Sequence, residues 1–194
     1  MDDSFSDVSL RAVLAVIFPE VCDKSGATCL LCGVAGVGKT TVANLLQLRG
    51  WVRLSIDEYI WEHFGQYGVD YEPSCYESLQ STAEEHLRRK LMDLLEGQTS
   101  IVVDFSFWRR NRRDEYRALI EAAGRSCTLL HLYAPRETLL KRLADRAGRR
   151  DANAAFPISV GLLDRYLAGF EVTYMEDAIH LDTGAFKEAF SKSL

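Results

Sequence analysis

Residues 33–40 read Gly-Val-Ala-Gly-Val-Gly-Lys-Thr and match the pattern G-x-x-x-x-G-K-[ST] without a mismatch. The apolar run at 28–32 precedes them, and the helical pattern at 41–48 follows. In such a loop the glycines let backbone N–H groups close around a phosphate. Lys39 then places a charge between the β- and γ-phosphates, and the Thr40 hydroxyl can ligate Mg²⁺. The motif predicts a strand, a phosphate-binding loop and a helix in that order.

We predict that a bound nucleotide contacts the whole loop and the residue that follows it. The predicted nucleotide contacts within this stretch are Gly33, Val34, Ala35, Gly36, Val37, Gly38, Lys39, Thr40 and Thr41.

Strand patterns alternate with helix patterns along the chain. Apolar or alternating runs predict strands at 28–32, 51–56, 101–104, 127–132 and 178–181. Amphipathic spacing predicts helices at 9–18, 59–64, 74–96, 110–123 and 135–146. This alternation is typical of an α/β fold with a mostly parallel sheet.

The 194 residues are enough for one well-buried core, so we expect a single domain over 1–194. The helix pattern near the start makes residues 1–24 an N-terminal helical extension on the outside of that domain. The basic, small-residue stretch at 147–157 predicts a loop or hinged flap, and we expect a lid over about 141–158.

Composition narrows the classes of partner. The hydrophobic content of 47% and charged content of 26% are ordinary for a globular protein, and no run is apolar enough to span a membrane. The acidic start, Met1-Asp2-Asp3, has the wrong sign for a signal peptide, so we expect a cytoplasmic protein. A net charge of -5 and a pI of about 5.4 argue against a nucleic-acid binder, although a local basic groove stays compatible with them.

Two acids follow predicted strands, and the carboxyl ends of parallel strands form the ligand crevice of such sheets. Asp57 would face the γ-phosphate and accept a proton from an acceptor hydroxyl. Asp104 would hold Mg²⁺ together with Thr40. The alternative for each acid is that it caps the helix that follows.

Basic residues cluster in two further segments. Arg142 and Arg146 lie four apart beside the predicted flap, so we rank them as lid arginines that offset the charge on the transferred phosphoryl group. We read the other arginines as a solvated basic face, the tryptophans as packing residues and His131 as a core histidine. Those residues are Arg109, Arg110, Arg112, Arg113, Arg149, Arg150, Trp51, Trp61 and Trp108.

Five stretches carry a resemblance to a known family. They are CGVAGVGKTTVANLL, RLSIDEYIWEHFG, SIVVDFSFWRRNRRDEYRALIEAAG, LLHLYAPRETLLKRLADR and FEVTYMEDAIHLDT. Over about residues 27 to 184 the chain resembles the zeta-toxin/chloramphenicol-phosphotransferase-like branch of P-loop kinases. The resemblance implies a nucleoside-monophosphate-kinase-like P-loop NTPase, with a three-layer α/β/α core around a five-stranded parallel sheet and a helical lid.

The resemblance also implies ATP with Mg²⁺ as the phosphate donor and a hydroxyl group as the acceptor. On this analogy Lys39, Asp57, Arg142 and Arg146 are catalytic, and Thr183 lies in a turn near the adenine. Relatives often carry a proline after the Phe-Glu pair, where this chain has Val172 and Thr173, so its path near the base departs from the pattern.

The leading hypothesis is an ATP-dependent transfer of phosphate to a small hydroxyl compound, such as a nucleoside-like molecule or an antibiotic. The alternatives are a polynucleotide 5′-hydroxyl kinase, a nucleotide-dependent switch or ATPase without an acceptor, and a zeta-type toxin that acts on nucleotide-sugars. We expect the acceptor pocket at 58–80, whose aromatic residues suit a ring-bearing molecule or, equally, a core. These residues are Tyr59, Trp61, His63, Phe64, Tyr67, Tyr71 and Tyr76.

Overall fold

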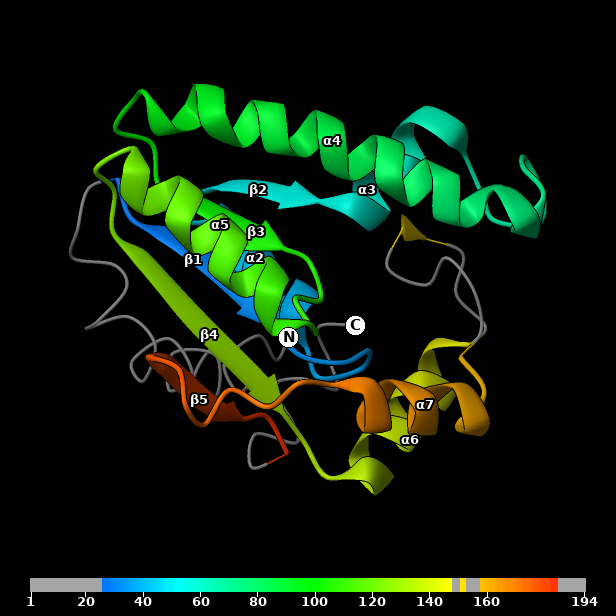
Figure 1. Ribbon diagram of the computed structural model, residues 1–194. Coiled ribbons are helices and arrows are strands. Elements are labelled where there is room, and N and C mark those ends of the chain that lie inside the picture. The colour runs from blue at the N-terminus through cyan, green and yellow to red at the C-terminus, as the bar shows by residue number, and fades with distance from the viewer. Residues whose placement is uncertain (1–25, 148–150, 153–157, 185–194) are drawn as a thin grey trace, which may run out of the picture.

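The computed structural model describes residues 26–147, 151–152 and 158–184 (Figure 1). The predicted N-terminal helix at 9–18 lies outside the described residues, as does most of the predicted flap. The described strands are β1 (Thr28–Cys32), β2 (Val52–Ser55), β3 (Ile101–Asp104), β4 (Cys127–Tyr133) and β5 (Ala178–Asp182). The described α-helices are α2 (Lys39–Gln47), α3 (Ile56–Phe64), α4 (Tyr76–Leu95), α5 (Arg110–Ala122), α6 (Arg136–Arg146) and α7 (Val160–Gly169), and a 3₁₀ turn spans Pro73–Cys75.

The strands form one five-stranded parallel sheet in the order β2-β3-β1-β4-β5. Parallel neighbours need long crossovers, and the helices between strands supply them. The sheet and its helices confirm the predicted α/β fold of the P-loop NTPase type. Because the strands are parallel, their carboxyl ends lie at one edge of the sheet, and the loops after β1, β2 and β3 meet there (Figure 1).

Two hydrophobic layers cover the sheet. Side chains of α2, α6 and α7 pack on one face, and side chains of α4 and α5 pack on the other. Successive strand residues point to opposite faces, so Cys29 packs in the first layer and Cys32 in the second. Both are free, buried thiols.

The start of α3 differs from the prediction. The helix begins at Ile56 rather than Tyr59, because the Ser55 hydroxyl accepts a hydrogen bond from the Glu58 N–H at 3.3 Å and caps it. Asp57 therefore lies in the first turn of a helix. Within the described part of the chain, no helix is long and apolar enough to cross a bilayer.

Candidate active site

A cavity of about 340 Å³ opens at the carboxyl edge of the sheet. Residues from the phosphate-binding loop, α3, α4, the loop after β3, α6 and α7 line it. The lining residues are Val34, Ala35, Gly36, Gly38, Lys39, Thr40, Ile56, Asp57, Tyr76, Gln80, Asp104, Phe105, Ser106, Trp108, Arg142, Arg146, Ile158 and Tyr166.

The loop from Gly33 to Gly38 has a backbone that only glycines adopt readily. The φ angles are 143° at Gly33, 84° at Gly36 and 95° at Gly38. A Cβ atom on Gly33 would lie 2.4 Å from the carbonyl oxygen of Leu132, so that position has no room for a side chain. Gly33 and Val37 do not line the cavity themselves, and the side chain of Val37 is buried in the core.

Lys39 begins α2 and directs its ammonium group back along the loop. Its Nζ donates to the carbonyl oxygens of Gly33 at 2.8 Å and Val34 at 3.0 Å. Burial lowers the pKa of Lys39, and the carboxylates of Asp104 and Asp57 oppose that shift. A cation held inside a glycine cradle fits the phosphate groups of a nucleotide.

Asp104 ends β3 and contacts two other groups. Its Oδ2 accepts from Thr40 Oγ1 at 3.4 Å and from Arg53 Nη2 at 2.7 Å and Nε at 3.1 Å. Asp104 does not cap the next helix, since Arg109 occupies the N-cap position of α5. Sequence reasoning did not select Arg53, although a charged residue between the apolar Val52 and Leu54 of a strand was a signal for it.

Thr40 and Asp104 present the hard oxygen ligands that Mg²⁺ prefers. In the described residues, no group of three His, Cys, Asp or Glu side chains could hold a metal ion by itself. A Mg²⁺ ion here would therefore depend on phosphate oxygens and water for its other ligands, which is the usual arrangement for this ion. The two residues fit the predicted metal role, which stays a prediction.

Asp57 faces the same cavity from the first turn of α3. The Tyr76 hydroxyl donates to Asp57 Oδ1 at 3.1 Å, and the Tyr76 ring meets Tyr67 edge to face with centroids 5.5 Å apart. Asp57 is exposed in the cavity, yet desolvation by the surrounding protein and the nearby Asp104 raise the pKa of its carboxyl. The Tyr76 hydrogen bond, Lys39 and Arg146 act in the opposite direction.

The two predicted lid arginines occupy different surroundings. Arg142 is buried, and its guanidinium donates to Thr183 Oγ1 at 2.9 Å, to the Thr183 carbonyl at 2.8 Å and to the Gly36 carbonyl at 3.3 Å. Arg142 thus ties the phosphate-binding loop to the turn after β5. Arg146, one turn further along α6, lines the cavity and lies close enough to Asp57 and Lys39 to affect their pKa values.

Two further predicted nucleotide contacts, Thr41 and Thr183, do not line the cavity. Thr183 is fully buried, and its N–H donates to the Tyr133 carbonyl at 2.8 Å. Thr41 is buried on α2 and does not line the cavity. Thr183 therefore holds Arg142 in place, and any contact of Thr41 or Thr183 with a nucleotide stays a prediction.

The aromatic residues at 58–80 divide into two groups. Tyr59 stacks on His63 at 4.0 Å and contacts His86 at 4.8 Å between centroids, which places it in packing between α3 and α4. Of the seven predicted aromatic residues, only Tyr76 lines the cavity. Gln80 lies within the predicted acceptor range 58–80, and Ile158 ends the predicted lid. Sequence reasoning missed the remaining wall residues, which come from segments far apart in the chain. These residues are Ile56, Phe105, Ser106, Trp108 and Tyr166.

Comparison with known families agrees with this geometry. The model of a family described as AAA domain matches residues 29–173, which is more than half of the chain. The chain therefore belongs to the AAA domain family, and a P-loop domain of this type implies nucleotide binding. A search of curated proteins found no match.

Solved structures show the same fold at low sequence identity. An inferred kinase from Chloroflexus aurantiacus aligns with a TM-score of 0.64 at 17% identity, covering 86% of this chain and 90% of that one. A gluconokinase from Sinorhizobium meliloti aligns at 0.58 and 16%, covering 88% and 90%. Kti12 from Chaetomium thermophilum, solved with ADP-AlF3, aligns at 0.55 and 14%, covering 85% and 96%. The fold is that of P-loop kinases and related nucleotide-binding proteins.

Proposed function

We propose that this protein is an ATP-dependent kinase that transfers the γ-phosphoryl group to a hydroxyl of a small molecule. The observation that carries the proposal is that Lys39 and Asp57 face one cavity, so a phosphate-binding loop and a tuned carboxylate share a site. An acid that faces the phosphate-binding loop is placed to accept a proton from a hydroxyl, a role that nucleotide binding alone does not require. The sequence resemblance to the zeta-toxin/chloramphenicol-phosphotransferase-like group supports the same reading.

The residues would divide the reaction among them. The acceptor oxygen bonds to the γ-phosphorus, the bond from that phosphorus to the β–γ bridging oxygen breaks, and ADP leaves with that oxygen. Asp57 takes the proton of the acceptor hydroxyl, and a raised pKa suits a carboxylate that must hold this proton. Lys39 and Arg146 offset the negative charge on the phosphates and on the transferred group.

Thr40 and Asp104 would hold Mg²⁺, which neutralises phosphate charge and orients the β- and γ-oxygens when bound. Arg142 has a different task in this scheme. By joining Gly36 to Thr183, it holds the phosphate-binding loop in the shape that the nucleotide requires.

The test compares the parent protein with Asp57→Asn in two assays. Nucleotide affinity is measured with a fluorescent ATP analogue, and ³²P transfer from ATP is measured with a panel of sugars, sugar acids, nucleosides and 5′-hydroxyl oligonucleotides. We expect parent-like affinity in Asp57→Asn and a loss of transfer of at least about 100-fold, the scale of general-base catalysis. Glu62→Gln on the same helix is a matched control.

Three results would contradict the proposal. Parent-rate transfer by Asp57→Asn would remove the assigned base. ATP hydrolysis that no acceptor changes would favour a switch or ATPase, and transfer to oligonucleotides alone would favour a polynucleotide kinase.

A further inference from the structure

Trp108 lies in the loop between β3 and α5 and lines the cavity together with Tyr76 and Tyr166. Trp108 is 37% exposed, whereas tryptophan residues are highly buried on average. The phosphate-binding loop occupies another part of the same wall. The Arg109 guanidinium lies over the indole, 4.9 Å from the ring centroid, and the part of the indole that lines the cavity is available for stacking on a ligand.

The backbone before Trp108 is strained. Phe107 has a φ of 43°, and among the described residues it is the only non-glycine residue with a positive φ. Such strain persists only where the surrounding structure holds it, and it concentrates at functional sites. The carbonyl oxygen of Phe107 accepts two hydrogen bonds, one from Arg113 Nη1 at 2.8 Å and one from the Cys32 thiol at 3.3 Å. Burial raises the pKa of Cys32 to about 11, so the thiol stays protonated and can donate.

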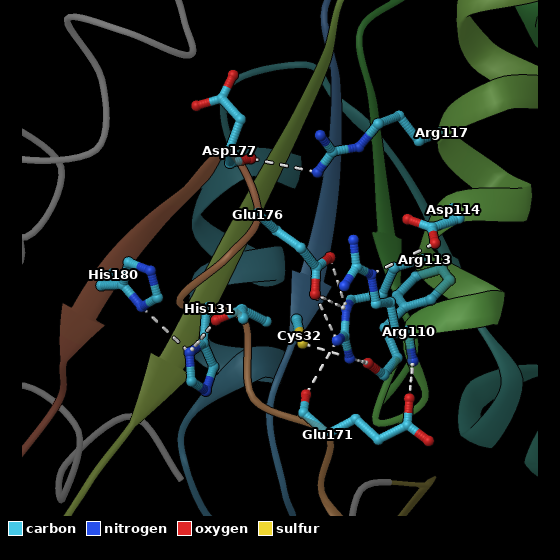
Figure 2. A network of polar contacts seen from close by, with 12 residues as sticks. Cys32, Arg110, Arg113, Asp114, Arg117, His131, Glu171, Glu176, Asp177 and His180 are labelled. Atoms are coloured by element: carbon cyan, nitrogen blue, oxygen red, sulfur yellow. Dashed lines mark hydrogen bonds and ion pairs between the residues drawn. The ribbon is translucent and has the colours of Figure 1, made fainter.

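Arg113 connects this loop to the segment after α7 (Figure 2). Its fully buried guanidinium pairs with Glu176, from Nη2 to Oε1 at 2.6 Å and from Nε to Oε2 at 2.9 Å, and donates to the Glu171 carbonyl at 2.9 Å. A buried ion pair is costly to desolvate and adds little net stability. Its evident effect here is to hold two distant segments in one arrangement.

The segment after α7 also contacts Trp108 directly. The Glu171 N–H donates to the Trp108 carbonyl at 2.9 Å, and the Glu171 carboxylate accepts from the Arg110 N–H at 2.6 Å. The indole packs so tightly on Gly169 that a Cβ atom there would lie 2.9 Å from the ring. Backbone strain, a buried ion pair and a glycine contact together place this one side chain.

We propose that Trp108 is the specificity-determining wall of the acceptor subsite and that the acceptor carries a planar ring, with nucleosides as the simplest class. This inference rests on the proposed kinase function. The ring would stack on the indole, the Gln80 amide would bond to polar groups on the ring edge, and the hydroxyl would reach Asp57. An open-chain sugar acid has no planar ring that could stack on the indole.

The binding test uses Trp108 as its own reporter. The chain has three tryptophans, so Trp51→Phe with Trp61→Phe leaves only Trp108. A non-hydrolysable ATP analogue first fills the donor site, and adenosine, uridine, glucose or gluconate is then titrated. We expect a saturable change in Trp108 fluorescence with at least one nucleoside and none with glucose or gluconate. An equal change with gluconate, or no change with either nucleoside, would overturn the inference.

The kinetic test compares Trp108→Ala with Trp108→Phe on a nucleoside acceptor. We expect Trp108→Ala to raise the acceptor KM at least about 5-fold, the lower end of ring stacking on an aromatic side chain, with the KM for ATP unchanged. Trp108→Phe should recover most of that loss, and the exposed Met92→Ala on α4 is the control. An unchanged acceptor KM in Trp108→Ala would contradict the inference.

The two proposals fail in different ways. Phosphate transfer to a ringless hydroxyl compound, with Trp108→Ala as active as the parent, would retain the kinase and reject the Trp108 subsite. Nucleoside binding at Trp108 without transfer to any acceptor would retain the subsite and reject the kinase.

Discussion

Arg53 donates two hydrogen bonds to a single oxygen of Asp104, from Nη2 at 2.7 Å and from Nε at 3.1 Å. The two side chains are only 3% and 4% exposed. Thr40 donates to the same oxygen at 3.4 Å, so the acid that would serve Mg²⁺ already has a protein cation beside it. Strands β2 and β3 are neighbours in the sheet, and this adjacency brings the pair together.

Arg53→Ala is expected to lower the free energy of unfolding by about 3 kcal/mol or more, because it leaves the buried Asp104 without its partner. Urea denaturation followed by circular dichroism measures this change. The control is Arg89→Ala, whose partner Glu85 lies 3.5 Å away in an exposed pair and which should cost under about 1 kcal/mol. An equal loss of unfolding free energy in the two variants would show that the buried Arg53–Asp104 pair stabilises the protein no more than the exposed pair does.

Tyr76→Phe is expected to change the pH profile of phosphate transfer. The Tyr76 hydrogen bond lowers the pKa of Asp57, so its removal raises that pKa further. A base works when deprotonated, so activity is present above its pKa and is lost as the pH falls through it. The acid limb of kcat/KM should therefore move to higher pH in Tyr76→Phe. A limb that stays in place, or moves to lower pH, would refute the role of this hydrogen bond.

Gly33→Ala is expected to disrupt the phosphate-binding loop, since its Cβ would lie 2.4 Å from the Leu132 carbonyl oxygen. Gly50→Ala is the matched control, because Gly50 also has a positive φ, 87°, but a Cβ there meets nothing within 4 Å. Gly50→Ala should cost about 1 to 2 kcal/mol of backbone strain. Gly33→Ala should lose more than this in thermal unfolding and should also lose affinity for ATP. Similar melting temperatures and affinities in the two variants would contradict the clash.

Arg142→Lys and Arg146→Lys are expected to separate the two arginines of α6. A lysine at 142 lacks the planar, forked guanidinium that reaches from Gly36 to Thr183, so the loop should loosen and the KM for ATP should rise. Arg146 lines the cavity, so its replacement should mainly lower kcat. Steady-state kinetics with varied ATP measure both constants. A fall in kcat alone in Arg142→Lys would restore the direct lid role predicted from sequence.

The order of strands and helices was predictable because each element has a local signal. Hydrophobic spacing located the five strands, and the glycine-lysine motif located the loop between β1 and α2. The start of α3 was missed because Ser55, two residues before Asp57, takes the capping position that either polar residue could fill. Both candidate acids, Asp57 and Asp104, face the predicted cavity.

The surroundings of side chains were less predictable. Arg142 and Arg146 share one side of a helix by spacing, and both line the cavity, yet Arg142 is buried and donates its hydrogen bonds to Thr183 and Gly36. Helical spacing states which residues share a side, and it carries no information on what packs there. Trp108 looked like a packing residue, and its contact with Gly169 agrees with that, but its indole also lines the cavity.

The sequence by itself determined the phosphate-binding loop and the parallel α/β fold, because the conformational demands of glycine and the periodicity of apolar residues act over short stretches of chain. Only the tertiary structure decided that Arg53 partners Asp104, that Tyr76 partners Asp57 and that Trp108 lines the cavity beside Gly169. Tyr76 and Asp57 are 19 positions apart in the sequence, and Arg53 and Asp104 are 51 apart. The third contact joins Gly169, at the end of α7, to Trp108 in the loop after β3. Packing of the sheet and its helices, rather than any local pattern, brings them together.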